Sequence, residues 1–302
     1  MNPTPRFAAA WPAWTPSVAS PLGWPTVFIG LWSSGYVAGK VGLPYAGPFT
    51  LIFLRFSLAA MVLLAVSLLT QAPWPRTPRQ WGHIAVVGVL IQALQFSGLY
   101  AGLSMGVSAG VSALIVGLMP IFTAVGAVAF LGERVSRRQV GGLGLGLAGV
   151  ALVVAHKVRL DAGSVAGYLA VGLALVGITA GTLYQKKFCA EMDLRTGGCI
   201  QLSVATVIVG MMGYATEGLA VQWSPALIAS SLWLSLVNSI GAISVLFLMV
   251  RRGEASRVAS LFYLIPAVTA VMGYLVLGET LAPLQVLGFL VSASGVYLTT
   301  RR

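Results

Sequence analysis

The chain contains one sequence pattern written twice, 146 residues apart, and this duplication constrains its fold more than any other feature. Residues 105–150 align with residues 251–296 without a gap, and 15 of the 46 aligned positions are identical. The same offset pairs residues outside this block: Gly35 with Gly181, Lys40 with Lys186 and Ser57 with Ser203. A fixed offset over such a length is a repeat signal, so nearly the whole chain is one unit present in two copies.

The composition places the chain among membrane proteins. It is 58% hydrophobic and only 8% charged, with a mean hydropathy of +0.91, whereas a soluble protein is about 25% charged. The net charge of +11 does not indicate a nucleic-acid partner, because the Lys and Arg residues lie between apolar runs, where membrane topology explains them.

Ten apolar runs are long enough to cross the roughly 30 Å hydrocarbon core of a bilayer as helices. Five fall in each copy, which predicts an all-α integral membrane fold of ten transmembrane helices. They do not alternate as the strands of a β-barrel would. The runs lie near residues 24–42, 48–70, 82–101, 107–131, 138–156, 165–187, 197–218, 226–250, 256–277 and 282–300.

Three segments are expected along the chain. Residues 1–22 hold five prolines and should form a flexible cytoplasmic tail, with no pattern of a signal peptide. Residues 23–156 should form the first five-helix repeat, and residues 165–302 the second.

Lys and Arg are unevenly divided between the two sets of predicted loops. Of 18, 14 lie in the tail, in the loops after the second, fourth, sixth and eighth helices, or at the C-terminus; three lie on the other side, and Arg55 lies inside a helix. This bias predicts that both termini are cytoplasmic. An odd number of helices per repeat inverts the second copy relative to the first, which is typical of secondary transporters with a site near the midplane.

The chain shows no sequence pattern of an enzyme. All seven acidic residues fall at predicted helix ends or in loops, and no metal-ligand cluster, nucleophile–base set or phosphate-binding loop is present. We therefore predict no catalytic residue, no metal and no cofactor. Proton relays and sites for cationic drugs use a buried carboxylate, so both are disfavoured.

Two amides are predicted at the same depth in the two copies. Gln92 lies at the centre of the third helix, and the offset carries it to Asn238 at the centre of the eighth. They either face a polar cavity and bind substrate or join helices by hydrogen bonds. Gln95 is one turn from Gln92 and could share its face.

Further candidates for substrate binding are aromatic and basic. Trp32, Tyr36 and Lys40 recur every four residues and form one stripe, which either lines a cavity or anchors the helix at the interface. Arg55 either faces the cavity or caps neighbouring carbonyls. Tyr100, Tyr184 and Tyr263 complete the set.

Proline and glycine occupy matching positions of the two copies. Pro120 and Pro266 are expected to bend the fourth and ninth helices, either as parts of a gate or as static kinks. Small residues in the fifth and tenth helices allow close packing, within the fold or between protomers of a homodimer. Glu133 and Glu279 are expected to pair with nearby loop groups.

These features resemble the drug/metabolite transporter superfamily, in its EamA group of bacterial ten-helix exporters. The resemblance covers residues 24–300 and is carried by the run from Trp32 to Lys40, by Leu54-Arg55-Phe56, and by the doubled Pro…Leu-Gly-Glu…Gln…Gly…Gly pattern that begins at Pro120 and Pro266. It implies a basket of helices around a central cavity, with the fifth and tenth helices at the periphery, and export by alternating access in the inner membrane.

The expected function is export of amino acids, aromatic or apolar ones above all, or of similar small metabolites. The alternatives are a multidrug or sugar-like exporter and, in another class, a membrane receptor or enzyme. The expected partners are the lipid bilayer and a small-molecule substrate, with no nucleic acid. The protein is either a monomer or a homodimer.

Overall fold

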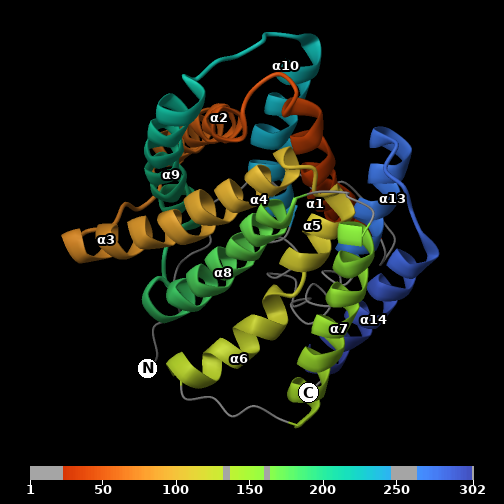
Figure 1. Cartoon of the computed structure of the whole chain (residues 1–302). Helices are drawn as coiled ribbons and strands as arrows, with labels where there is room; N and C mark the ends of the chain where they lie inside the picture. The colour runs from red at the N-terminus through yellow and green to blue at the C-terminus, as the bar shows by residue number, and fades with distance from the viewer. Residues whose placement is uncertain (1–22, 132–136, 160–163, 246–263, 301–302) are drawn as a thin grey trace.

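The computed structural model describes residues 23–131, 137–159, 164–245 and 264–300, and this part of the chain is almost entirely helical (Figure 1). The predicted tail, Glu133 and the candidate Tyr263 lie outside these ranges. The elements are α1 (Gly23–Gly42), α2 (Pro48–Leu69), α3 (Pro78–Val87), η1 (Gly88–Leu94), α4 (Gln95–Ser104), α5 (Ala109–Val116), α6 (Met119–Leu131), α7 (Arg137–Arg159), α8 (Val165–Phe188), α9 (Leu194–Glu217), α10 (Pro225–Leu232), η2 (Trp233–Ala242), α13 (Ile265–Leu277) and α14 (Pro283–Thr300). The labels η1 and η2 mark π-helical segments.

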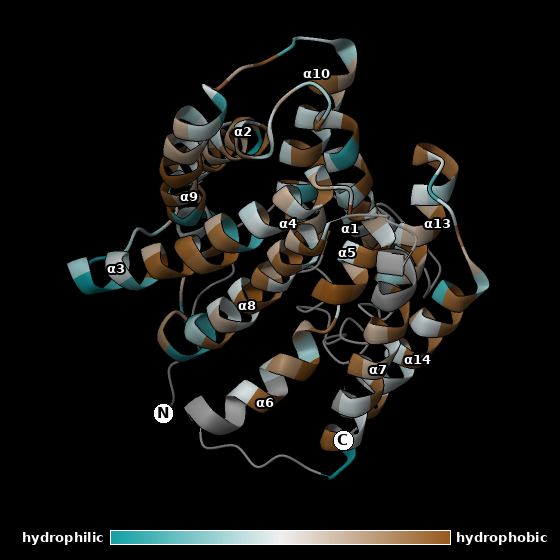
Figure 2. Ribbon diagram, in the orientation of Figure 1, coloured by the Kyte–Doolittle hydropathy of each residue, from teal (hydrophilic) through white to brown (hydrophobic). Residues whose placement is uncertain are grey.

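Five helices are long and apolar enough to cross a membrane, and four shorter apolar helices accompany them within the described residues. The five are Pro48–Leu69, Pro78–Ser104, Val165–Phe188, Leu194–Glu217 and Pro225–Val245. No more than half of each apolar window is buried inside the protein. Apolar residues run along the helices (Figure 2), and large ones such as Leu69, Leu169 and Met211 are exposed. Apolar residues facing outward over whole helices are what a lipid environment requires.

Helix starts follow the local sequence. Thr77 accepts a hydrogen bond from the backbone N–H of Gln80, whose side chain bonds back to the N–H of Thr77, and Pro78 follows as the first helical residue of α3. Serines cap α5, α8 and α10 in the same manner. These caps explain why α3 begins earlier than the apolar run at residue 82 predicts.

The span predicted at residues 107–131 is interrupted just before Pro120. It is divided into α5 and α6 at Gly117 and Leu118, and Pro120 is the second residue of α6. Pro266 is likewise the second residue of α13. Proline fits the first turn of a helix because its missing N–H would have no partner there. The role of the two prolines, as parts of a gate or as static kinks, stays a prediction.

The contacts between the two copies are reciprocal. α2 packs along α9 and α7 along α14, so that each helix of these pairs meets its own copy. α1 packs on η2, while α8, the copy of α1, packs on η1, the copy of η2. A side chain at Gly149 would meet the backbone of Ser292, and one at its copy Gly295 would meet that of Gly146. This exchange of contacts is the pattern that a twofold rotation produces.

Candidate functional site

A buried arginine lies where α2, α4 and η2 meet. Arg55 is 6% exposed; its Nε donates to Ser239 Oγ at 3.0 Å and its Nη1 to the Tyr100 hydroxyl at 3.1 Å. The guanidinium carbon lies 4.4 Å from the centre of the Phe96 ring, within cation–π range. The backbone carbonyl of Arg55 accepts a hydrogen bond from Ser235 Oγ at 3.0 Å. Among the described residues, the guanidinium donates to these two hydroxyls.

The charge of Arg55 is balanced by no carboxylate in the part of the chain that the structure describes. The ion pairs found there are Lys40–Glu279 and Arg195–Asp193. A buried charge costs several kcal/mol unless it is paired, and hydroxyls and an aromatic face compensate only part of this. The site around Arg55 is therefore electropositive and suited to an anionic group.

Asn238 lies in η2 next to Ser239, and its side chain faces α1. Its Nδ2 donates to the Leu31 carbonyl at 2.6 Å, and the side chain is 8% exposed. The approach depends on Gly35, where an added Cβ would lie 2.8 Å from Nδ2. The Oδ1 atom is buried and has no hydrogen-bond partner among the described residues. The amide thus joins two helices through its nitrogen, while its oxygen is buried without a partner among the described residues.

Both candidate amides lie in π-helical segments. Gln92 is in η1 and Asn238 is in η2, and the offset of 146 carries residues 88–94 onto 234–240, inside η2. π-Helical turns are rare and occur frequently at functional sites. Gln92 is half-buried, and Gln95, at the start of α4, is 5% exposed.

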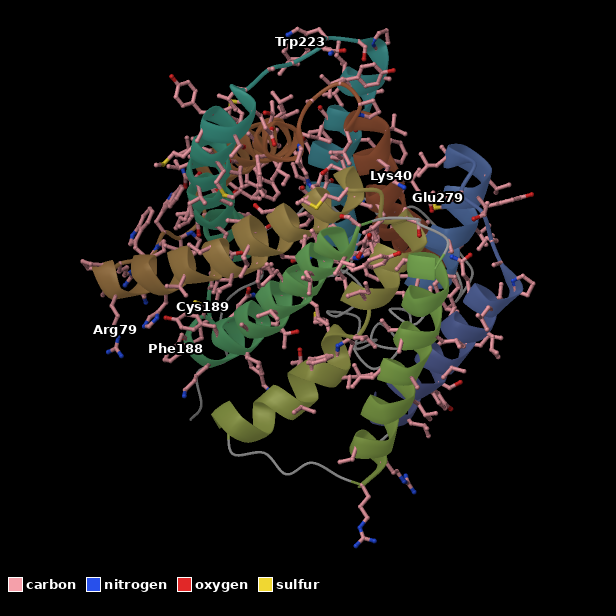
Figure 3. All side chains as sticks on the ribbon, viewed as in Figure 1. Lys40, Arg79, Phe188, Cys189, Trp223 and Glu279 are labelled. Atoms are coloured by element: carbon pink, nitrogen blue, oxygen red, sulfur yellow. The ribbon has the colours of Figure 1, made fainter. Side chains whose placement is uncertain are left out.

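Lys40 lies at the end of α1 and binds an acid from the other copy. Its Nζ is 2.7 Å from Glu279 Oε1, and the same oxygen accepts a hydrogen bond from the Ala109 N–H at 2.9 Å. Figure 3 shows the two side chains side by side, between α1 and α13. Glu279 therefore links the C-terminal end of α1 to the first residue of α5. The sequence suggests pairing with nearby loop groups, and the partners found are distant ones: Lys40, 239 positions away, and Ala109, 170 positions away.

The remaining aromatic candidates divide between two places. Tyr36 is buried in the core with Tyr100, and Trp32 packs partly buried beside Phe28. Tyr184 lies elsewhere: its hydroxyl is 2.8 Å from His83 Nδ1, near the end of α8. The structure therefore gathers Tyr36, Tyr100 and Arg55 but does not bring Tyr184 to them.

Sequence reasoning missed three members of the Arg55 cluster, Phe96, Ser235 and Ser239. Serine and phenylalanine are common in membrane helices, where most of them serve packing. One signal was available: Ser235 and Ser239 are four residues apart and flank Asn238, so they share its region of the helix.

An apolar groove of about 340 Å³ lies between α5, α6, α7 and α8. Its lining includes Leu118, Phe122 and Val150 and is almost wholly apolar. Such a groove has no charged group with which to orient a small polar substrate. The buried polar cluster around Arg55 is therefore the better candidate site.

Comparison with known proteins places this chain in a family. The model of the EamA-like transporter family matches twice, at residues 26–155 and 165–301. An uncharacterized transporter, YvbV of Bacillus subtilis, is 30% identical over 90% of this chain and 88% of its own. A probable amino-acid metabolite efflux pump of Salmonella typhimurium is 25% identical over 89% of this chain and 90% of its own.

A solved crystal structure has the same fold. It superposes with a TM-score of 0.66 at 18% sequence identity and covers 91% of this chain and 95% of the other. The family match spans both copies of the repeat, and the apolar helices agree with a multi-pass membrane protein. This chain therefore belongs to the EamA-like transporter family.

Proposed function

We propose that this protein is a secondary transporter that exports amino acids, aromatic or apolar ones above all, across the bacterial inner membrane. The observation that carries the proposal is the buried guanidinium of Arg55, held by Tyr100 and Ser239 and facing Phe96, without a carboxylate partner in the described residues. A permanent cation beside aromatic rings suits a substrate with a carboxylate and an apolar side chain. The name of the Salmonella typhimurium relative, a probable amino-acid metabolite efflux pump, supports the same class.

Transport would proceed by alternating access between two inverted five-helix halves, residues 23–156 and 165–302. The reciprocal contacts of α2 with α9 and of α7 with α14 support such a pair of halves. The Arg55 cluster would lie in the cavity between them, with Gln92 and Asn238 as amides contributed by the two copies. The broken helix at Gly117 would give one half a place to bend.

Flux in proteoliposomes tests the proposal. Purified protein is reconstituted into liposomes loaded with radiolabelled phenylalanine, tryptophan, leucine or glutamate, and efflux is compared with that from protein-free liposomes. We expect protein-dependent efflux, faster for the aromatic and apolar amino acids than for glutamate. Failure to move any amino acid would refute the substrate class. Efflux of a labelled drug or sugar, without efflux of any amino acid, would favour the alternative exporters.

A further inference from the structure

We infer that the site recognises both charged groups of an α-amino acid, with Arg55 binding the carboxylate and the Oδ1 atom of Asn238 accepting hydrogen bonds from the ammonium. This inference rests on the proposed function and names what its site recognises. It makes the zwitterion, rather than the carboxylate alone, the required feature of the substrate.

The orientation of the Asn238 amide is fixed by its partner. The Leu31 carbonyl is an acceptor, so only the Nδ2 end of the amide can face it, at 2.6 Å. The Oδ1 end must then point away from that carbonyl, and it is buried without a partner in the described residues. A buried acceptor left unpaired costs about 1–3 kcal/mol. A donor brought by a ligand would remove this cost.

Consecutive residues of η2 link this oxygen to the guanidinium. Ser239 follows Asn238 and bonds to Nε of Arg55, while Ser235 bonds to the carbonyl of Arg55. Tyr100 closes the arrangement, because its hydroxyl accepts from Arg55 and its ring lies 3.1 Å from where a Cβ at Gly39 of α1 would be. The acceptor and the cation thus belong to one cluster formed by α1, α2, α4 and η2.

The charges of the cluster select among three substrate classes. An organic cation without a carboxylate would be repelled by Arg55. A carboxylate without an ammonium would satisfy Arg55 and leave Oδ1 of Asn238 unpaired. An α-amino acid carries both a carboxylate for Arg55 and an ammonium for Oδ1 of Asn238. Sites that hydrogen-bond a substrate group reject analogues that lack it.

Three ligands with the same phenyl group test this recognition by equilibrium binding to the full-length purified protein. They are L-phenylalanine, 3-phenylpropionate, which lacks the ammonium, and phenethylamine, which lacks the carboxylate. We expect the wild type to prefer phenylalanine to 3-phenylpropionate by about tenfold or more, as for a hydrogen bond between an amide and a charged group. Equal affinity for these two ligands would overturn the inference.

Two variants and a control assign the preference to Asn238. Asn238→Leu should reduce the preference for phenylalanine over 3-phenylpropionate to near unity. Gly35→Ala, which displaces the amide without removing it, should lower the preference in the same direction. Gln201→Leu replaces a buried amide of α9, outside the site, and should keep the wild-type preference. An unchanged preference in Asn238→Leu, or an equal loss of both affinities, would show a structural role only.

Gly35→Ala keeps the amide and decides the matter if Asn238→Leu does not fold. Its preference for phenylalanine over 3-phenylpropionate should fall below that of the wild type; an unchanged preference would overturn the inference. The flux assay separates a failure of the proposed function from a failure of this inference. A wild type that moves no amino acid refutes the proposed function, whereas one that moves phenylalanine while Asn238→Leu keeps the ligand preference refutes only this inference.

Discussion

Arg55 is a buried cation whose position costs stability. It is a cation that is 6% exposed, and the structure surrounds it with hydroxyls and aromatic rings. Replacing buried ionic groups by apolar residues of similar volume is often neutral or stabilising. A site that binds an anionic group needs the charge, however, and accepts its cost when the substrate is absent.

Replacing Arg55 by methionine separates these two effects. Arg55→Met should unfold at a temperature equal to or above that of the wild type, because a buried charge is removed and the side-chain volume is kept. Amino-acid efflux should fall to the level of protein-free liposomes. Unfolding in detergent and flux in liposomes measure the two properties. A variant that is much less stable but still transports would show that Arg55 is structural.

Helix ends are where distant parts of the chain meet. The carboxylate of Glu217, at the end of α9, accepts hydrogen bonds from the N–H groups of Phe49 and Thr50 at 2.9 Å and 2.7 Å, in the first turn of α2. Glu279 does the same for Ala109 of α5 while it also pairs with Lys40. A carboxylate at a helix start satisfies free N–H groups and complements the helix dipole. Both contacts join one copy of the repeat to the other.

The Lys40–Glu279 pair should act on the helices rather than on the substrate. The effects of Lys40→Met and Glu279→Gln on the free energy of unfolding should be coupled by about 1 kcal/mol in a double-mutant cycle. Each substitution alone already removes the ion-pair partner of the other residue. In the double variant KM should stay within about twofold of the wild type while kcat changes, since the helix contact is altered and the binding site is kept. A tenfold rise in KM would instead place Lys40 among the substrate-binding residues.

The start of α9 should respond to acid. Burial raises the pKa of Asp193, but hydrogen bonds from the Arg195 side chain and backbone, with Nη2 at 2.8 Å, outweigh it and hold the pKa below its usual value. A lowered folded-state pKa gives stability that is complete above the ordinary pKa of aspartate and is lost as the pH falls through the folded value. Asp193→Ala should therefore cost about 1 kcal/mol at neutral pH, less in acid.

Unfolding temperatures measured across this acidic range test the effect, with Ser224→Ala as the control. Ser224 caps α10 with a hydroxyl that does not titrate, so its loss should cost the same at every pH. A gap between the wild type and Asp193→Ala that stays constant down to strongly acidic pH would contradict the assignment.

The sequence predicted some of these elements and not others, for physical reasons. The repeat predicted that Asn238 occupies the position in its copy that Gln92 occupies in the other. A constant offset places paired residues at the same point along matching helices. Arg55 was evident as a charge in an apolar run. The partner of Lys40 was not predictable, because Glu279 meets it only through tertiary packing. The interruption before Pro120 was not predictable, since proline alone does not tell a kink from a helix start. The π-helical turns have no sequence pattern that periodicity detects.

The arrangement of the helices gives the molecule two distinct ends. Arg79, at the start of α3, lies near Phe188 and Cys189 at the end of α8, whereas Trp223 lies far from them, before α10 (Figure 3). The positive-inside pattern assigns the first group to the cytoplasmic side and Trp223 to the opposite side. The regions around Arg79 and Cys189, which belong to two of the loops predicted to share a side, thus lie together in the structure.

Single cysteines at these ends test the orientation. In a background with Cys189 and Cys199 replaced by alanine, a membrane-impermeant maleimide applied to intact spheroplasts should label Trp223→Cys, since Trp223 is 70% exposed. Arg79→Cys should be labelled only after the membrane is opened. The reverse pattern would place both termini outside and contradict the predicted topology.

The π-helical turns in η1 and η2 lie at matching positions of the two copies. Such a turn holds one residue more than an α-helical turn, and the offset of 146 relates residues both before and after these turns, so both copies hold that residue. Each widened turn carries one of the two amides, Gln92 or Asn238. The side chain of Gln92 is one methylene longer than that of Asn238, so the two copies match in backbone and differ in the polar group that each presents.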